Sequence, residues 1–548
     1  MSERWYDEAV IYCVEVESYA DSDGDGVGDF RGLIGRLDYL YRLGVTCLWL
    51  NPIHPSPHRD GGYDVTDFYT VDPRLGTLGD FAELLHQANN RGIKVIIDLV
   101  VNHTSDQHPW FESACSSPDS PYRDWYVWSQ TEPPDRYQGM VFPGEQKETW
   151  TYNRRAKAWF YHRFYDFQPD LNTANPAVRA ELKRIMGFWV QLGVAGFRMD
   201  AAPFVIEQVR PGVEDRPLDF EFLTELRTHL SWRRGDALLL AEANVAPDEL
   251  VRYVADRGGS ANRIHMLFDF LLSDRVVLAL ARGQSEPVIE ALRNTPKLPA
   301  GAQWATFLRN HDEIDLSRLT ADQRAEVFAA FGPEEIMQLY GRGIRRRLAP
   351  MLGGDRRRLE LAYSLQFTLR GTPVLRYGEE IGMGDDLSLP GRDAIRTPMQ
   401  WSSNKNGGFT DADTPIRPVV SGGDFGYQKV SVTAQRHDSS SLLAWFERMI
   451  HTLRESPEVG AGACAPVDQE MPGTVLAHRA DGPSGRMVFL HNLGTEPVRV
   501  NLGKLAGEAN NPNQVFGNQE YREVGDLREL DLDPYGYRWI RLCRNAAG

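Results

Sequence analysis

Residues 94–103, KVIIDLVVNH, form a short continuous apolar run that ends in polar side chains. Such a run favours a strand buried on both faces, of the kind that parallel sheets contain. Other runs of this character occur along the chain, and long segments with helical periodicity separate them. The eight predicted strands cover residues 9–16, 46–50, 94–101, 194–199, 237–241, 264–270, 305–308 and 373–377. Strand and helix in alternation over eight units predict an α/β fold, the (β/α)8 TIM barrel.

Amphipathic segments supply the helices of this pattern. Clear examples are residues 33–43, 78–91, 176–192, 247–256 and 355–369. Polar residues at the carboxyl ends of the strands are therefore the place to look for an active site, because TIM barrels assemble their sites there.

Two further structural units are expected. The segment between Asn102 and Asn172 is rich in Trp, Tyr, Pro and charge, and it is too long for an ordinary strand-to-helix loop. We expect an inserted lid domain over the barrel mouth, after the third strand. Short alternating runs follow the helical segment 439–455 and predict a C-terminal antiparallel β domain. The expected units are residues 1–102 and 173–457 for the barrel, 103–172 for the inserted domain and 458–548 for a C-terminal β-sandwich.

Length and composition agree with several units of one globular protein. The 548 residues exceed the roughly 250–300 at which a single core stops growing. Hydrophobic residues make up 42% and charged residues 25%, the proportions of an ordinary globular protein. Acidic residues outnumber basic ones 76 to 60, for a net charge of −16. Because this charge repels phosphate and anionic lipid, we expect neither nucleic acid nor membrane as a partner.

The termini and the cysteines predict a cytoplasmic protein. The opening MSERWYDEAV lacks the features of a signal peptide, and no run of 18 apolar residues occurs. Five cysteines, odd in number and without metal-type spacing, favour reduced thiols over disulfides or zinc. They are Cys13, Cys47, Cys115, Cys464 and Cys543.

Three predicted strand ends are each followed by a carboxylate, at Asp200, Glu242 and Asp312. One such residue could be structural, but three at the same edge of a barrel favour a catalytic site. Arg198, two residues before Asp200, supplies the permanent charge that keeps one acid ionised.

The strings 98–103 (DLVVNH), 196–200 (GFRMD), 241–244 (AEAN) and 307–312 (FLRNHD) resemble, in order and spacing, the four signature regions of the α-amylase superfamily, glycoside hydrolase family 13. The resemblance implies a retaining mechanism. Asp200 would attack the anomeric carbon, and Glu242 would protonate the leaving oxygen and later deprotonate the acceptor. Asp312 would bind the two hydroxyls next to the anomeric carbon.

The resemblance also implies a set of substrate contacts. His103 and His311 would bind hydroxyls of the same ring, and the ring of Tyr63 would support that glucose. Asp60, with Arg392 or Arg396, would close the pocket behind it, as in exo-acting relatives that take small α-glucosides. The implied substrate-binding residues are Asp60, Tyr63, His103, Gln168, Arg198, His311, Arg392 and Arg396.

Residues 21–29, DSDGDGVGD, place oxygen donors at alternate positions, as hard-cation binding requires, although the string could also be an acidic turn. An EF-hand is not expected, because its twelfth position, where a bidentate glutamate is needed, would be Gly32. The string resembles the structural Ca²⁺ loop of family 13 α-glucosidases and trehalose synthases, where Mg²⁺ is an alternative. The implied ligands are Asp21, Asp23, Asp25, Val27 and Asp29. A second Ca²⁺ site implied by the resemblance comprises Asn102, Asp170, the carbonyls of Phe204 and Val205, and Glu207. No organic cofactor is expected.

Longer strings resemble the trehalose synthases of this family: residues 55–64, 102–111, 241–244 and 343–350. The implied reaction releases glucose from maltose, keeps it enclosed, and lets its anomeric hydroxyl attack the ester on Asp200 to give trehalose; hydrolysis is the side reaction. The expected partners are small α-glucosides, maltose and trehalose, and a homo-oligomer is left open.

Three features depart from the trehalose synthase pattern. Residues 12–18, YCVEVES, are unusual at the first strand, Asp269 is a residue type also seen in hydrolytic relatives, and Arg376 stands where an aromatic is usual. Two alternatives therefore stay open. One is a hydrolytic or transglycosylating exo-acting α-glucosidase, and the other is a non-catalytic amylase-like binding domain.

Overall fold

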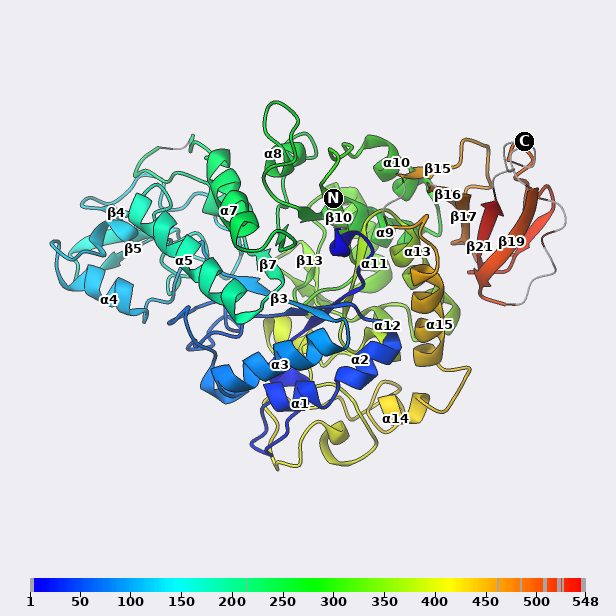
Figure 1. Cartoon of the computed structure of the whole chain (residues 1–548), viewed down its shortest axis with the longest axis horizontal. Helices are drawn as coiled ribbons and strands as arrows, with labels where there is room; N and C mark the ends of the chain where they lie inside the picture. Colours follow the sequence, from blue (N-terminus) through cyan, green and yellow to red (C-terminus); the bar gives the residue numbers. More distant parts are fainter. Residues whose placement is uncertain are drawn as a thin grey trace.

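The computed structural model of the chain describes residues 4–213, 215–460, 463–482, 485–505, 510–519, 524 and 527–543. Eight parallel strands close into a barrel in the order β1-β14-β10-β9-β8-β7-β3-β2, which confirms the predicted TIM barrel (Figure 1). The strands are β1 (Ile11–Val14), β2 (Cys47–Leu50), β3 (Lys94–Leu99), β7 (Gly196–Met199), β8 (Leu238–Ala241), β9 (Met266–Phe268), β10 (Gln303–Thr306) and β14 (Thr372–Arg376).

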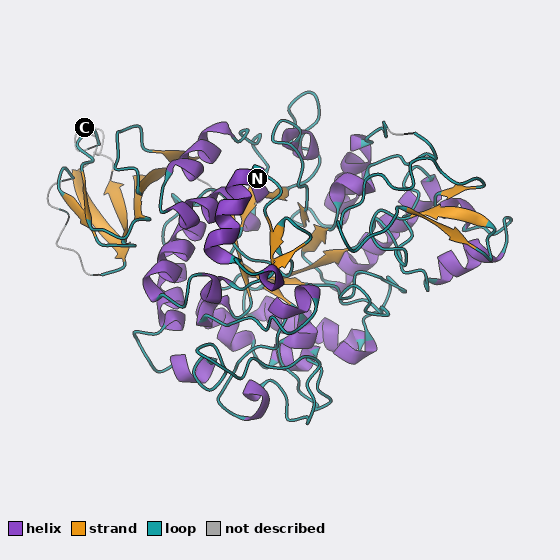
Figure 2. Cartoon of the chain, turned by 180° about the vertical axis from the view of Figure 1, so that it is seen from behind, coloured by secondary structure: helices purple, strands orange, loops and turns teal. Residues whose placement is uncertain are grey.

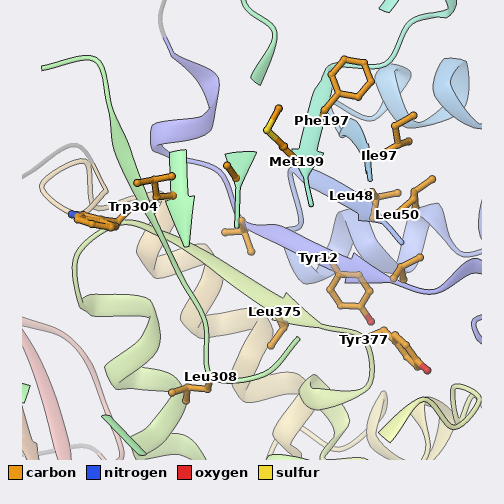
Figure 3. Close-up of a cluster of buried hydrophobic side chains, with 14 of the residues drawn as sticks. Tyr12, Leu48, Leu50, Ile97, Phe197, Met199, Trp304, Leu308, Leu375 and Tyr377 are labelled. Atoms are coloured by element: carbon orange, nitrogen blue, oxygen red, sulfur yellow. The ribbon is translucent and has the colours of Figure 1, made fainter. Parts of the chain in front are cut away.

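The barrel strands are buried on both faces, as their continuous apolar runs predict. Tyr12 and Leu48 belong to the core between the strands and the helices, whereas their neighbours Ile11 and Cys47 belong to a separate buried cluster. Successive side chains of a strand point to opposite faces, so the second cluster fills the barrel interior. Figure 3 shows the outer cluster, including Phe197 and Leu375.

Helices surround the barrel strands (Figure 2). The principal ones are α1 (Phe30–Ile34), α2 (Leu37–Leu43), α3 (Leu78–Asn90), α5 (Pro176–Leu192), α7 (Phe220–Arg233), α8 (Leu250–Val254), α9 (Phe270–Arg282), α10 (Glu286–Asn294), α11 (Ala321–Phe331), α13 (Arg356–Thr368) and α15 (Leu442–Arg454).

Several predicted boundaries differ from the structure, and three of the differences concern the helices around the barrel and the strand before Asp312. The segment 33–43 is not one helix, because α1 ends at Ile34 and α2 begins at Leu37. The helix expected over 247–256 shortens to α8. Strand β10 lies two residues before the predicted 305–308, since Phe307 and Leu308 are buried in the loop that leads to the site. Apolar character marks burial, and buried loop residues carry it as well as strands do.

The inserted unit after β3 contains α4 (Pro109–Ser116) and a three-stranded antiparallel sheet in the order β4-β6-β5. Its strands are β4 (Trp128–Ser129), β5 (Trp150–Asn153) and β6 (Ala158–Tyr161). Figure 1 shows α4, β4 and β5 on the side of the barrel opposite to β17, β19 and β21.

The C-terminal part is antiparallel β structure, as predicted. A five-stranded sheet has the order β15-β16-β17-β21-β19, and a two-stranded sheet pairs β18 with β20. The strands are β15 (Ala463–Pro466), β16 (Val475–Asp481), β17 (Gly485–Asn492), β18 (Val498–Val500), β19 (Asn510–Gly517), β20 (Leu530–Leu532) and β21 (Tyr537–Cys543). The exact domain boundaries stay predictions.

Two observations bear on the other sequence expectations. In the part of the chain that the structure describes, no helix has both the length and the apolar character needed to cross a membrane. The thiols of Cys13, Cys47, Cys115 and Cys464 are free. The side chain of Cys543 lies outside what the structure describes.

Candidate active site

Neighbouring barrel strands bring the first two predicted catalytic carboxylates together. Asp200 directly follows β7 and Glu242 directly follows β8, and the last residues of these strands, Met199 and Ala241, are paired in register. Asp312 lies in the loop after β10. All three line one cavity of about 500 Å³. The carboxyl ends of the strands therefore form the pocket that the sequence predicts.

Arg198 is the charged centre of this pocket. Its side chain is buried, and its Nη1 lies 2.6 Å from Oδ1 of Asp200 and 3.1 Å from Oδ1 of Asp98. Its Nη2 donates to the Glu242 carboxylate. One guanidinium thus bridges the predicted nucleophile and the predicted acid.

The protonation of these two acids is set mainly by burial. Burial raises the pKa of Asp200 to about 6 and that of Glu242 to about 7, while Arg198 acts in the opposite direction on both. The sequence expectation that Arg198 favours the charged form of Asp200 thus has the right sign, but desolvation outweighs it. Glu242 is the acid more easily kept protonated near neutral pH.

Asp312 has the opposite electrostatic setting. Burial alone would raise its pKa, but Arg392, His311 and Arg396 outweigh burial and hold the pKa of Asp312 well below its usual range. Nη1 of Arg392 lies 3.0 Å and Nη2 of Arg396 3.1 Å from the same oxygen, Oδ1, and Nε2 of His311 lies 3.2 Å from Oδ2. Asp312 is therefore a permanently ionised carboxylate beside two acids that titrate.

The predicted ring-binding residues lie in contact with one another. The Tyr63 hydroxyl is 2.7 Å from Nε2 of His311 and donates to Oδ2 of Asp98 at 3.1 Å. The rings of Tyr63 and His311 stack with centroids 5.6 Å apart. Nε2 of His103 lies 3.0 Å from the Tyr63 carbonyl oxygen. Of these three residues, Tyr63 and His103 line the cavity and His311 does not.

The residues predicted to close the pocket differ in how they reach the cavity. Gln168 is buried and donates from Nε2 to Oδ2 of Asp60 at 2.9 Å. Asp60 and Arg392 line both the cavity that contains the three carboxylates and a second hollow of about 530 Å³. Arg396 lines only the second hollow. Of the two arginines left open by the sequence, Arg392 therefore lines the cavity of the three carboxylates and Arg396 does not.

Several pocket residues received no role from the sequence. Asp98, inside a signature string, links Arg198 to Tyr63, and its position within the strand hid that contact. Glu313 lines the cavity and accepts a hydrogen bond from Nε of Arg392 at 2.7 Å. Phe142 and Phe164 reach the cavity from the inserted unit. No local pattern could find the last two, because their distance from the strand ends depends on how the insertion folds.

The structure brings together part of the first predicted metal set. Carboxylate oxygens of Asp21, Asp23 and Asp29 lie within 4.8 Å of one another, and such a group suits a hard cation. Asp25 is not in this group. It is exposed, and its Oδ1 accepts from the backbone N–H of Val27 at 2.7 Å.

The second set is only partly assembled around Asp170. Asn102 donates a side-chain hydrogen bond to this buried carboxylate, and burial raises the pKa of Asp170 to about 7. Arg163 contacts the Glu207 carboxylate, and its backbone N–H donates to Oδ1 of Asp170 at 2.9 Å. Phe204 lines the catalytic cavity, whereas the neighbouring Val205 is buried in the core. A cation at this position would compete with Arg163 for Glu207.

Comparison with known proteins identifies the family. Residues 13–338 and 344–462 match the alpha amylase, catalytic domain, family, and residues 485–541 match the sucrose hydrolase-like, C-terminal domain. The chain therefore belongs to the α-amylase family of enzymes, glycoside hydrolase family 13.

Individual relatives have related names. The chain is 41% identical over 556 residues to a trehalose synthase/amylase of Mycolicibacterium smegmatis, covering 98% of this chain and 93% of that protein. It is 40% identical over 553 residues to a trehalose synthase of Pimelobacter sp., covering 98% and 96%. Among solved structures, the trehalose-6-phosphate hydrolase of Bacillus licheniformis superposes with a TM-score of 0.79 at 25% identity, over 99% of this chain and 100% of that one.

Proposed function

We propose that this enzyme interconverts maltose and trehalose by a retaining mechanism, with some hydrolysis to glucose. The observation that carries the proposal is the shared guanidinium: Arg198 meets Asp200 with one terminal nitrogen and Glu242 with the other. This arrangement favours the short carboxyl separation of retaining glycosidases over the wider one that inverting enzymes need for a water molecule. The names of the relatives support the same activity.

The first step transfers the terminal glucose to the enzyme. A carboxylate oxygen of Asp200 attacks the anomeric carbon, and the bond from that carbon to the bridging oxygen breaks. Glu242 gives its proton to the bridging oxygen, which leaves on the second glucose. Asp312 remains ionised beside Arg392 and Arg396, and it would hold the two hydroxyls next to the reacting carbon.

The second step releases the glucose unit to a new acceptor. Glu242, now a carboxylate, takes the proton of the anomeric hydroxyl of the released glucose. That oxygen attacks the anomeric carbon and displaces Asp200, which yields trehalose. If water takes the place of this hydroxyl, glucose is the product. The outcome therefore depends on how long the pocket excludes water while the released glucose turns over.

Two cavity residues favour action on small substrates. Asp60 and Arg392 line the cavity and would meet the hydroxyls of a terminal glucose, while Gln168 would hold Asp60 in place. The ring of Tyr63, stacked on that of His311, would support the apolar face of the same sugar, and His103 and His311 would bind its hydroxyls. The pocket would accordingly select the non-reducing unit of a disaccharide.

Product analysis on maltose tests the proposal. Purified protein should convert maltose mainly to trehalose, and trehalose back to maltose, with a smaller amount of glucose. Glucose as the sole product would contradict the mutase activity and favour the exo-acting α-glucosidase. The Asp200→Ala variant is the control: it should show no turnover, and retained activity would contradict its role as nucleophile.

We also propose that the loop containing Asp21, Asp23 and Asp29 holds a structural Ca²⁺, or Mg²⁺ in its place. The convergence of three carboxylates supports this assignment. The cation would hold together the loop that follows β1, and it would take no part in the glucosyl transfer. The second Ca²⁺ site, near Asp170, stays a prediction. A cytoplasmic location is proposed as well, and the free thiols of the described cysteine side chains support it.

A further inference from the structure

We propose that Glu15 is a positioning residue that holds Arg396 against Asp312, and that Arg376 in turn keeps Glu15 in place. Glu15 lies one residue beyond β1, and Arg376 is the last residue of β14. These two strands are neighbours in the barrel, with Cys13 paired to Arg376. Both residues belong to stretches that depart from the pattern of the trehalose synthases, and in the structure they contact each other.

The contacts form an alternating row of charges that ends at the substrate pocket. Nη2 of Arg376 lies 3.4 Å from Oε2 of Glu15, and Nε of Arg396 lies 3.3 Å from Oε1 of the same carboxylate. Nη2 of Arg396 is 3.1 Å from Oδ1 of Asp312. The order is therefore cation, anion, cation, anion, from the barrel wall to the pocket.

Glu15 is well placed to fix the direction in which Arg396 points. Nε of Arg396 also donates to the His311 carbonyl oxygen at 2.9 Å, so this nitrogen has one neutral and one charged partner. With its Nε held, the planar guanidinium presents Nη2 to Asp312 in a single orientation. Arg396 does not line the substrate cavity, and its contact with Asp312 is the link through which it would act on the sugar.

Arg376 depends on Glu15 for its charge balance. Its side chain is fully buried, and within the described residues its Nε and Nη1 have no hydrogen-bond partner. Its Nη2 donates to the Ile395 carbonyl oxygen at 3.1 Å, beside Arg396 in the chain. Removing Glu15 alone would leave the buried charge of Arg376 without its ion-pair partner, and removing Arg376 alone would take from buried Glu15 one of its two cationic partners. Either change should lower stability, whereas removing both should cost less.

Stability and turnover should respond differently to these changes, which distinguishes a positioning role of Glu15 from a purely structural one. The test compares E15M, R376M and the double variant E15M/R376M with wild type, by thermal unfolding and by kcat and KM for the total maltose consumed. Each single variant should unfold at lower temperature, and the double variant should recover most of that loss. Its kcat should stay at least about tenfold below wild type with little change in KM, because Arg396 has lost the ion pair with Glu15 that steadies it against Asp312.

Two further variants sharpen the comparison. E15Q/R376M keeps an acceptor in reach of Arg396 and should recover part of the kcat lost in E15M/R376M. E17Q is the matched control, because Glu17 pairs with Arg417 and Arg74 and not with Arg396. A double variant with wild-type kcat, or an E17Q variant with the same loss as E15M, would overturn the inference.

The inference rests on the proposed glucoside chemistry, and the assay keeps the two apart. Counting all maltose consumed makes the comparison independent of whether trehalose or glucose is formed. If the wild-type enzyme makes only glucose, the mutase proposal is contradicted. The variants would still support or refute the role of Glu15. A wild-type protein without any turnover would contradict both.

Discussion

Arg198→Lys tests the charged centre of the pocket. The guanidinium presents one terminal nitrogen to Asp200 and Asp98 and the other to Glu242, and a lysine ammonium is a single point that cannot keep all three contacts. Loss of one charge-assisted hydrogen bond removes about 1.5–3 kcal/mol. If the lost contact is the one to Asp200, kcat/KM should fall about 10- to 150-fold.

The same loss predicts a shift in pH dependence. Asp200 must be ionised to attack, so activity is lost as pH falls through its pKa, which burial already raises to about 6. Weakening the contact that stabilises the Asp200 carboxylate by about 1.5–3 kcal/mol raises the pKa of Asp200 by about one to two units. The acid limb of the kcat/KM profile should move to higher pH by that amount.

The assay is the initial rate of maltose consumption between acidic and neutral pH. Arg184→Lys is the control, because Arg184 is largely exposed and its pair with Glu181 should contribute little. Its profile should match that of the wild type. If Arg198→Lys lowers the rate but leaves the acid limb unmoved, Arg198 does not set the ionisation of the nucleophile and the reasoning fails.

Three other perturbations have definite expected outcomes. Glu242→Gln removes the acid whose pKa lies at about 7, so the remaining activity should no longer fall as pH rises through that value. Maltose turnover should fall about 10²- to 10⁴-fold. A 4-nitrophenyl α-glucoside, whose leaving group needs no proton, should still transfer its glucose to Asp200 at close to the wild-type rate. Added Ca²⁺ should raise the midpoint of thermal unfolding, and a chelator should reverse the increase. If the Kd is one hundredth of the free Ca²⁺ concentration, binding adds about 2.7 kcal/mol to the free energy of unfolding. The Asp23→Asn variant should show a smaller increase. Gly196→Ala should lower the free energy of unfolding by about 1–3 kcal/mol, because φ at Gly196 is +155° and an added Cβ would lie 2.2 Å from the Leu238 carbonyl oxygen. Gly235→Ala is the control, because an added Cβ at Gly235 meets no atom within 4 Å. Equal urea midpoints for the two alanine variants would refute the expected clash at Gly196.

Local patterns predicted the eight barrel strands along the chain and the positions of the three predicted catalytic carboxylates after strand ends. Asp200 and Glu242 directly follow their strands, so an apolar run in the sequence is enough to locate them. Boundaries were less accurate where apolar residues continue beyond a strand, as at Phe307 and Leu308. The role of Asp98 was not found, because a carboxylate within an apolar strand gives no sign of which partner it faces.

The amino-acid sequence by itself determined the barrel, the added units and the residue types available for catalysis, because periodicity and motif spacing are local properties. Only the tertiary structure decided which charges meet. Glu15 and Arg376 lie 361 residues apart and touch because the barrel closes between β1 and β14. Arg392 lines the cavity of the three carboxylates and Arg396 does not, a distinction that the spacing of the two residues does not contain. The ionisation of Asp200, Glu242 and Asp312 likewise depends on burial and on nearby arginines, and both exist only once the chain is folded.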